Sequence, residues 1–266
     1  MLTAKAENAM TSRSPVVDSL VTVPCLSDNY AYLFRSGDAV AVVDVPEAGP
    51  IQRALAERGW RLTDILLTHH HDDHVQGVAE LVEATGARVL GAAADAHRLP
   101  PLDEALAPGD TVRVGEAEGR VIDVSGHTNG HIGFLFDGVA FTGDSLMSAG
   151  CGRLFEGTPE QMHESLAQFA DLPDDTLVAS GHEYTLTNLR FARSLEPDRA
   201  ALISREAEVE RRRAEGEPSV PSTMAIERNT NPFLRAHAPE LKAATDTTGQ
   251  SDVATFAATR RARDAF

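Results

Sequence analysis

The stretch LLTHHHDDHVQG, residues 66–77, places four of the chain's ten histidines within six residues, with two aspartates among them. Imidazoles and carboxylates resist burial unless they are paired or bind a metal, so such a cluster adds nothing to ordinary core packing. The alternative without a functional metal site is a histidine-rich surface loop. The pattern H-x-H-x-D-H is specific enough to favour a metal site.

The spacing within the cluster indicates how its side chains are distributed. In an extended stretch, residues two apart face the same way, so His69 and His71 should point together off the end of a strand over 63–68. Asp73 follows two residues later, and His74 begins the next helix. The cluster therefore offers two nitrogen ligands for one metal, and an oxygen and a nitrogen for a second metal close by.

Three more potential ligands stand where short apolar runs end. His127 lies in DVSGHTNGH, Asp144 in VAFTGDSL and His182 in TLVASGHEYT, each beside a glycine that allows a sharp turn. Any one of them alone is weak evidence, because polar residues at strand ends are often caps. Together with the cluster they make five histidines and two aspartates, a sufficient set for two metals.

Composition limits the classes of partner. The chain has 266 residues with 42% hydrophobic and 24% charged residues, and its formal net charge is −16. Such an acidic surface repels nucleic acid and anionic membranes, so we expect neither as a partner, and an anionic ligand would need a local basic pocket. No run of 18 apolar residues is present, and Cys25 and Cys151 read as free thiols in a reducing cytosol. We expect a cytoplasmic monomer.

The pattern of predicted helices and strands changes near Gly157. Residues 1–15 read as a disordered leader, and the following residues alternate short strands and helices, with an Asp137-Gly138 hairpin turn. A helix is expected over 74–86 and a strand followed by a helix over 87–96. After Gly157 the pattern predicts helices over 160–173, 185–195, 199–216 and 251–266, with GEPSVPST as a loop. The outline is an α/β domain followed by a mainly helical region, divided between 160 and 190.

The sequence resembles the metallo-β-lactamase superfamily and, within it, the glyoxalase II (hydroxyacylglutathione hydrolase) family over nearly the whole chain. H-x-H-x-D-H marks only the superfamily, whereas GCGRLFEGT, GHEYT and TNPFLR are specific to the family and lie in the right order. The resemblance implies an αββα sandwich over 16–185 with the metals at one edge. It also implies a helical, substrate-covering domain over 186–266.

The resemblance also assigns the ligands. It implies that His69, His71 and His127 bind one divalent ion, that Asp73, His74 and His182 bind the other, and that Asp144 bridges them together with a hydroxide. Asp73 and Asp144 are then catalytic as ligands that hold the hydroxide, and no separate nucleophile is required. Nitrogen and oxygen ligands without thiolates suit Zn, Fe or Mn alike.

The substrate implied is S-D-lactoylglutathione, or a related glutathione thioester, hydrolysed to glutathione and D-lactate in the second step of methylglyoxal detoxification. The positions that match the family's substrate contacts are Arg153, Tyr184, Arg260 and Arg263. Phe155 stands where many members have a second tyrosine, so one hydroxyl donor is missing here.

Four residues near the ligands are expected to play supporting roles. His70 and Asp72 alternate with the ligands and should face away from the metals. Asp44 and His131 are candidates to orient ligand imidazoles.

Three other functions fit parts of the pattern. The same ligands could serve another hydrolase of this fold, acting on a lactone, a phosphodiester or a β-lactam. A sulfur dioxygenase would use a single iron, and a metal-binding module without catalysis would have closed metal sites and no substrate groove.

Overall fold

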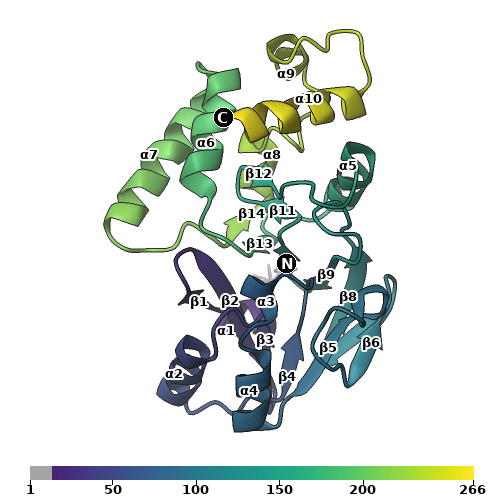
Figure 1. Cartoon of the computed structure of the whole chain (residues 1–266). Coiled ribbons are helices and arrows are strands. Elements are labelled where there is room, and N and C mark those ends of the chain that lie inside the picture. The colour runs from purple at the N-terminus through teal and green to yellow at the C-terminus, as the bar shows by residue number, and fades with distance from the viewer. Residues whose placement is uncertain (1–13) are drawn as a thin grey trace, which may run out of the picture.

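The computed structural model describes residues 14–266 as a two-sheet sandwich covered at one end by helices (Figure 1). Residues 1–13 of the expected leader lie outside the described residues, and Pro15 already begins α1 (Pro15–Ser19). Within residues 14–266, no helix combines the length and the apolar character needed to cross a membrane.

The first sheet has six strands in chain order and combines antiparallel with parallel pairs. Its strands are β1 (Val21–Cys25), β2 (Asn29–Ser36), β3 (Ala39–Val43), β4 (Asp64–Leu66), β5 (Arg88–Ala92) and β6 (Glu104–Leu106). The pairs from β3 to β6 are parallel, so each needs a crossover. The crossovers contain α2 (Ala48–Arg58), α3 (Asp72–Val75), α4 (Val78–Thr85) and the single 3-10 turn Ala93–Asp95.

The second sheet has the strand order β14-β13-β10-β9-β8-β7. Its strands are β7 (Thr111–Val114), β8 (Ala117–Asp123), β9 (Ile132–Phe136), β10 (Val139–Gly143), β13 (Leu177–Ser180) and β14 (Ser222–Thr223). A separate small hairpin, β11 (Leu146–Met147) with β12 (Gly150–Cys151), follows β10. Helix α5 (Pro159–Ala167) begins with a capping box between Thr158 and Gln161.

The helical region lies at one end of the sandwich (Figure 1). It contains α6 (Thr185–Leu195), α7 (Ala200–Ala214), α8 (Met224–Thr230), α9 (Pro239–Ala244) and α10 (Asp252–Ala265). Phe233 and Phe256 of this region share a buried cluster with Met162 of α5 and Ile122 of β8. The expected sandwich with a C-terminal helical domain is therefore the observed fold.

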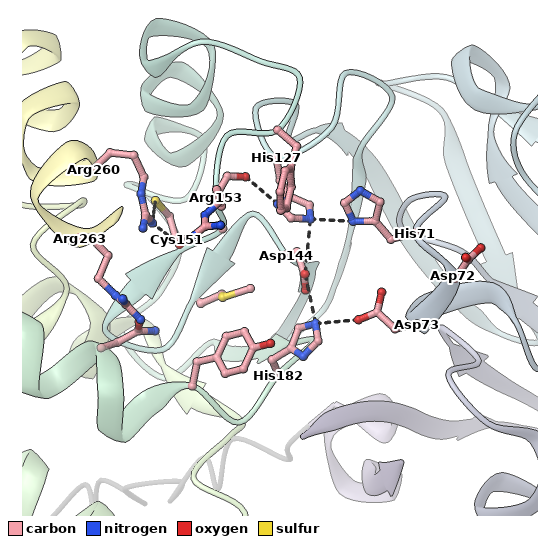
Figure 2. A pocket seen from close by; sticks show the side chains of 15 residues that line it. His71, Asp72, Asp73, His127, Asp144, Cys151, Arg153, His182, Arg260 and Arg263 are labelled. Carbon is pink, nitrogen blue, oxygen red and sulfur yellow. Dashed lines mark hydrogen bonds and ion pairs between the residues drawn. The ribbon is translucent and has the colours of Figure 1, made fainter. Parts of the chain in front are cut away.

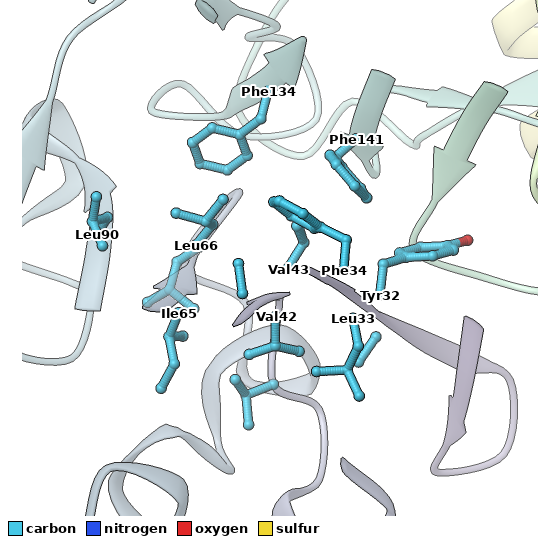
Figure 3. Packing of buried hydrophobic residues seen from close by; sticks show 14 of the residues in the cluster. Tyr32, Leu33, Phe34, Val42, Val43, Ile65, Leu66, Leu90, Phe134 and Phe141 are labelled. Carbon is cyan, nitrogen blue, oxygen red and sulfur yellow. The ribbon is translucent and has the colours of Figure 1, made fainter. Parts of the chain in front are cut away.

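Aromatic side chains fill the space between the two sheets (Figure 3). The Phe34 ring of the first sheet lies 5.5 Å from that of Phe141 and 5.1 Å from that of Phe136, both in the second sheet. Phe34 and Phe134 are fully buried. Strand β2 is buried on both faces because this core covers one face and helices cover the other, which explains its nearly continuous apolar sequence.

Strand direction brings the polar strand ends to one edge. Strands β3 and β4 are parallel, so Asp44 and Thr68 leave the first sheet at the same edge. Strands β10 and β13 are parallel as well, so Asp144 and the residues after Ser180 leave the second sheet together. Strand β8 is antiparallel to β9, which is antiparallel to β10, so the segment that contains His127 also starts at this edge.

Several local expectations were wrong. The helix expected over 74–86 is interrupted between α3 and α4 at Gly77, where a Cβ would lie 2.8 Å from the Ala48 nitrogen. The helix expected after β5 is only one 3-10 turn, and the expected GEPSVPST loop ends in β14, which pairs with β13. Helices α8 and α9 were not anticipated.

The aromatic core generates a stability prediction. Replacing Phe34 with alanine removes a fully buried ring and leaves a cavity between the sheets, so we expect the free energy of unfolding to fall by about 3–5 kcal/mol. Denaturant unfolding followed by circular dichroism measures the change. Ile203→Ala, at a site that is 44% exposed, is the control and should change stability by less than about 0.5 kcal/mol. Equal losses in the two variants would contradict the assigned core.

Candidate metal centre and substrate pocket

The five histidines and two aspartates singled out in the sequence converge at the edge between the two sheets. Three of them, His69, His71 and His127, form one group of potential ligand atoms, and Asp73, His74 and His182 form another. The polypeptide segments that supply them are the loop after β4 with α3, the loop after β8, the end of β10 and the end of β13.

The first group is arranged around His71. Its Nδ1 lies 3.2 Å from His69 Nε2 and 3.0 Å from His127 Nε2. Ligand atoms about 2.0–2.2 Å from one tetrahedral ion lie about 3.3–3.6 Å from one another, so these separations are close to those of a metal site.

The second group has a similar arrangement around His182. Its Nε2 lies 3.3 Å from His74 Nε2 and 3.4 Å from Asp73 Oδ2. The Asp73 oxygen is 3.9 Å from His74 Nε2, which completes the triangle.

Asp144 stands between the two groups (Figure 2). Its Oδ2 lies 3.5 Å from His127 Nε2 and 3.2 Å from His182 Nε2, and its Oδ1 lies 3.4 Å from His74 Nε2. Oδ1 is a buried oxygen to which the structure assigns no hydrogen-bond partner among the described residues. Such an atom is costly to bury, so it fits a missing cationic ligand.

Hydrogen bonds outside the two groups decide which nitrogen of each ring faces inward. The Nδ1 atoms of His74 and His182 each lie 2.8 Å from a carboxylate oxygen, that of Asp44 and that of Asp28, and so carry protons. His127 Nδ1 donates to the Arg153 carbonyl at 2.7 Å. In the neutral form of each of these rings the inward Nε2 therefore presents a lone pair, as metal ligation requires.

The tautomer of His69 follows from a relay through Thr68. The Thr68 hydroxyl donates its single proton to Asp44 Oδ2 at 2.8 Å. Its oxygen, 3.0 Å from His69 Nδ1, must therefore accept the proton of that nitrogen, which leaves His69 Nε2 unprotonated and directed inward. Asp44 also lies near His69 and His74 in a third potential metal group, but its oxygens are committed to these outer contacts.

Two backbone features hold this geometry. Asp44 has φ of +57°, a left-handed conformation that turns its carboxylate back toward Thr68 N, 2.8 Å away. Aspartate tolerates this region better than most residues, and the strain lies at a functional position. At Gly181 a Cβ would lie 2.5 Å from Asp144 Oδ1, so only glycine allows the two segments to meet.

The protonation pattern without a metal is consistent with a cation site. Burial lowers the pKa of His69, His71 and His127. Burial also disfavours the His74 and His182 cations, but the Asp144 carboxylate outweighs it and raises both pKa values. Protons on those two rings thus balance the Asp144 charge, and a bound metal would displace them. The donor set fits two divalent ions.

A cavity of about 710 Å³ opens beside the ligand atoms and leads away from them toward the helical region. Arg260 and Arg263 lie at its far end, and Arg153 lies between them and His127 (Figure 2). Tyr184 and Asn188 also line the cavity. The volume lies within the usual range of about 300–1,000 Å³ for small-molecule sites. The cavity provides the local basic surface that an acidic protein needs to hold an anion.

The three arginines differ in how far their guanidinium groups are already hydrogen-bonded to other residues of the protein. Arg260 is 6% exposed and donates to the Cys151 carbonyl at 2.9 Å and to Asp264 at 2.8 Å. Within the described residues, Arg263 forms hydrogen bonds only with Asn188 Oδ1, at 3.3 Å, and Arg153 is largely exposed beside Asp264. Arg153 and Arg263 are therefore the cations most available to a ligand.

Two aromatic rings flank the ligand groups. Tyr184 stacks on His182 with ring centroids 4.6 Å apart, and burial raises the pKa of its hydroxyl to about 12, so this group is a proton donor at neutral pH. Phe155 is 61% exposed and approaches His71 and His127 edge-on. The phenylalanine presents an apolar edge to the cavity where a tyrosine would add a donor.

The supporting residues behave partly as expected. His70 faces away from the ligands, with Nδ1 3.1 Å from Asp95, and Asp72 is exposed at the rim of the cavity. Asp44 does orient a ligand imidazole. His131 contacts two of the ligands, because its ring stacks on that of His69 with centroids 4.6 Å apart and its Nε2 accepts the Asp144 backbone N–H at 3.1 Å.

Three contributors were missed by the sequence analysis. Asp28 fixes His182, Thr68 fixes His69, and Asn29 donates to Asp73 Oδ2 at 3.0 Å. Thr68 stands directly before the cluster and could have been suspected. Asp28 and Asn29 lie 44 or more residues from their partners and carry no local signal.

Comparison with known sequences agrees with this site. Residues 27–182 match the family described as the metallo-beta-lactamase superfamily, and residues 183–266 match the hydroxyacylglutathione hydrolase C-terminus. The hydroxyacylglutathione hydrolase of Cereibacter sphaeroides (strain ATCC 17025) is 62% identical over 93% of this chain and 98% of its own length. The chain belongs to the hydroxyacylglutathione hydrolase family. The family member from Jannaschia sp. (strain CCS1) is 59% identical with the same coverage.

Solved structures place the family within a wider fold. ETHE1 from Myxococcus xanthus aligns with a TM-score of 0.62 and 25% identity over 91% of this chain and 89% of its own. TTHA1623, crystallised in a di-iron-bound form, aligns with a TM-score of 0.58 and 26% identity over 80% of this chain and 98% of its own.

The contact between Asp44 and His74 generates a prediction on metal binding. In Asp44→Asn, Asn tolerates the left-handed backbone, but its amide donates toward His74 Nδ1, which must then give up its proton. The ring changes tautomer and presents Nε2–H to the site, so we expect metal affinity to fall about 10–100-fold. Competition with a chelating indicator measures it.

Asp38→Asn is the matched control, because the exposed Asp38 forms, within residues 14–266, only a 3.9 Å ion pair with Arg35. It should leave metal affinity unchanged. Wild-type affinity in Asp44→Asn would refute the tautomer assignment.

Proposed function

We propose that the chain hydrolyses S-D-lactoylglutathione and related glutathione thioesters to glutathione and the free acid, D-lactate in the first case. The observation that carries this proposal is the convergence of five imidazoles and two carboxylates around Asp144, whose buried Oδ1 lacks a partner among residues 14–266. The hydroxyacylglutathione hydrolase names of relatives that are 50–62% identical support it.

The proposal assigns His69, His71 and His127 to one divalent ion, Asp73, His74 and His182 to the other, and Asp144 to both. Two such ions would supply a hydroxide at neutral pH for attack on the thioester carbonyl and would stabilise the oxyanion that develops. The chain's own residues fix the ligands: Asp28, Asp44 and the Arg153 carbonyl hold the proton on the outer nitrogen of each neutral ring, so that the inward nitrogen is the one available to a metal.

The far end of the cavity suits the glutathione moiety. Arg263 and Arg153 offer charge-assisted hydrogen bonds to its carboxylates, and the protonated Tyr184 hydroxyl is an additional donor. Arg260, already bonded to Cys151 and Asp264, shapes this end and adds charge. Phe155 contributes an apolar surface beside the reacting group.

The proposal also covers the identity of the metals, the cellular location, the oligomeric state and the domain boundaries. We propose Zn, Fe or Mn as the bound ions, and the di-iron form of TTHA1623 supports a pair of metals. We further propose a cytoplasmic monomer that acts in methylglyoxal detoxification, with a metal-binding domain over 16–185 and a substrate-covering domain over 186–266.

Metal removal tests the hydrolase directly. Chelation should abolish hydrolysis of S-D-lactoylglutathione, followed by loss of thioester absorbance, and addition of Zn, Fe or Mn should restore it, because no side chain replaces the ions as a source of nucleophile. Metal analysis of the same samples should show two ions per active chain. Two bound ions without turnover would remove the proposal, and oxygen consumption with one iron would indicate a dioxygenase.

Removing an arginine that binds a substrate carboxylate should weaken substrate binding more than it slows the chemical step. We expect Arg263→Ala to raise KM for S-D-lactoylglutathione about tenfold while kcat changes less than about threefold, because this guanidinium lies away from the reacting atoms. Steady-state kinetics on metal-loaded protein measures both constants. Arg211→Ala is the control and should leave KM unchanged. It removes an exposed arginine of α7 that forms an ion pair with Glu215. An unchanged KM in Arg263→Ala would exclude this cation from substrate binding.

A further inference from the structure

The segment PSTMAIERNTNPFLR contains a buried carboxylate that the proposed reaction does not use. Glu227, in α8, is fully buried, and no ion pair joins it to an arginine or lysine in the described part of the chain. Burial raises the pKa of this carboxyl. Burying a carboxyl group without a cation is expensive, so its contacts need a reason.

All the partners of Glu227 are neutral donors, and two of them belong to the β11–β12 hairpin, residues 146–151. Its Oε2 accepts the Ala149 backbone N–H at 2.7 Å, and its Oε1 accepts the Ser148 hydroxyl at 3.1 Å. Ser222 and Asn231 supply the other two hydrogen bonds. Ala149 has φ of +54°, so the turn that Glu227 holds is a strained one.

Asn231, at the end of α8, also binds this hairpin, through one main-chain carbonyl in each of its two strands. Its Nδ2 lies 3.0 Å from the Met147 carbonyl, 2.8 Å from the Gly150 carbonyl and 3.1 Å from Glu227 Oε2, so its two protons are shared among three acceptors. It is fully buried as well. Two side chains one helical turn apart thus satisfy the main-chain polar groups at the tip of the hairpin.

One side of the hairpin is continuous with the metal-ligand groups. Asp144 lies two residues before β11, and the Gly152 N–H donates to the Ser145 carbonyl at 3.1 Å. The next residue, Arg153, supplies the carbonyl that fixes His127. A shift of the hairpin would therefore move ligands of both metal groups.

The other side of the hairpin positions the cations. The Cys151 carbonyl accepts Arg260 Nη1 at 2.9 Å. The Ser148 carbonyl accepts Asn188 Nδ2 at 3.0 Å, and Asn188 Oδ1 in turn accepts Arg263 at 3.3 Å. The hairpin thus connects the metal-ligand end of the cavity with the arginine end.

We propose that Glu227 and Asn231 are positioning residues that set the distance between the metal-ligand groups and the arginines through the β11–β12 hairpin. A glutathione thioester must reach the metals with its carbonyl and the arginines with its carboxylates at the same time, so this spacing determines whether both contacts form. The inference rests on the proposed hydrolysis of glutathione thioesters.

The role depends on hydrogen-bond geometry rather than on charge. In Glu227→Gln, the amide oxygen can face the two N–H donors, Ala149 and Asn231. The amide NH2 can then face the hydroxyls of Ser148 and Ser222, which can accept as well as donate. This variant should retain the hairpin, whereas Glu227→Ala leaves the Ala149 N–H without a partner.

The experiment compares two thioesters on the full-length, metal-loaded protein. S-D-lactoylglutathione needs both ends of the cavity, whereas the D-lactoyl thioester of N-acetylcysteamine lacks both carboxylates and needs only the metals. We expect Glu227→Ala and Asn231→Ala each to lower kcat/KM for the glutathione thioester about 10–100-fold and that for the truncated thioester less than about threefold. Glu227→Gln should remain within about threefold of wild type on both.

Glu196→Gln is the matched control, because Glu196 is a buried carboxylate of the same helical region that pairs with Arg235 and does not contact the hairpin. It should leave the ratio of the two kcat/KM values unchanged, whatever it does to thermal stability. Equal losses on the two thioesters, or a Gln variant as poor as the Ala variant, would overturn the inference. A wild-type protein inactive on S-D-lactoylglutathione would instead overturn the proposed function.

Discussion

Four of the five histidines at the site have their outer ring nitrogen bound to an acceptor, and the convergence of their inner lone pairs depends on these bonds. Without the carboxylates of Asp28 and Asp44, the Thr68 hydroxyl and the Arg153 carbonyl, each ring could place a proton in the site. The inward lone pairs of the neutral rings repel one another, and a cation relieves this repulsion, either a metal ion or the protons on His74 and His182. The outer acceptors therefore commit the edge of the sandwich to metal binding before any metal arrives.

The sandwich makes this arrangement possible because parallel strands end together. Asp44 and Thr68 follow the parallel strands β3 and β4, and Asp144 and His182 follow β10 and β13. The site residues that follow β3 and β4 are thus rigidly attached to the first sheet, and those that follow β10 and β13 to the second. The aromatic core between the sheets sets the distance between these two sets of residues. Stability and catalysis share the same constraint, since each metal-ligand group takes ligands from both sheets and a change in the spacing of the sheets would pull the members of each group apart.

The sequence allowed the candidate ligands to be predicted well and their supporting residues poorly. The H-x-H-x-D-H spacing is local, and polar residues after apolar runs indicated His127, Asp144 and His182. Asp28 and Asn29 could not be predicted, because an aspartate and an asparagine in a turn are common and only the folded chain shows their partners. The same reason explains β14, which exists only through pairing with β13 more than 40 residues earlier, and the break at Gly77, which a contact with Ala48 imposes.

The acidic character of the protein has a physical consequence for an anionic substrate. A net charge of −16 repels glutathione derivatives at long range, but at physiological salt this repulsion decays within about 8 Å. Inside that distance the substrate meets Arg153 and Arg263, and the bound metals would add further positive charge. Hydrolysis converts a neutral thioester into a carboxylate and a thiol, so the products carry more negative charge than the substrate. Once they leave the arginines, the acidic exterior favours their departure, and attraction is thus confined to the cavity where the reaction takes place.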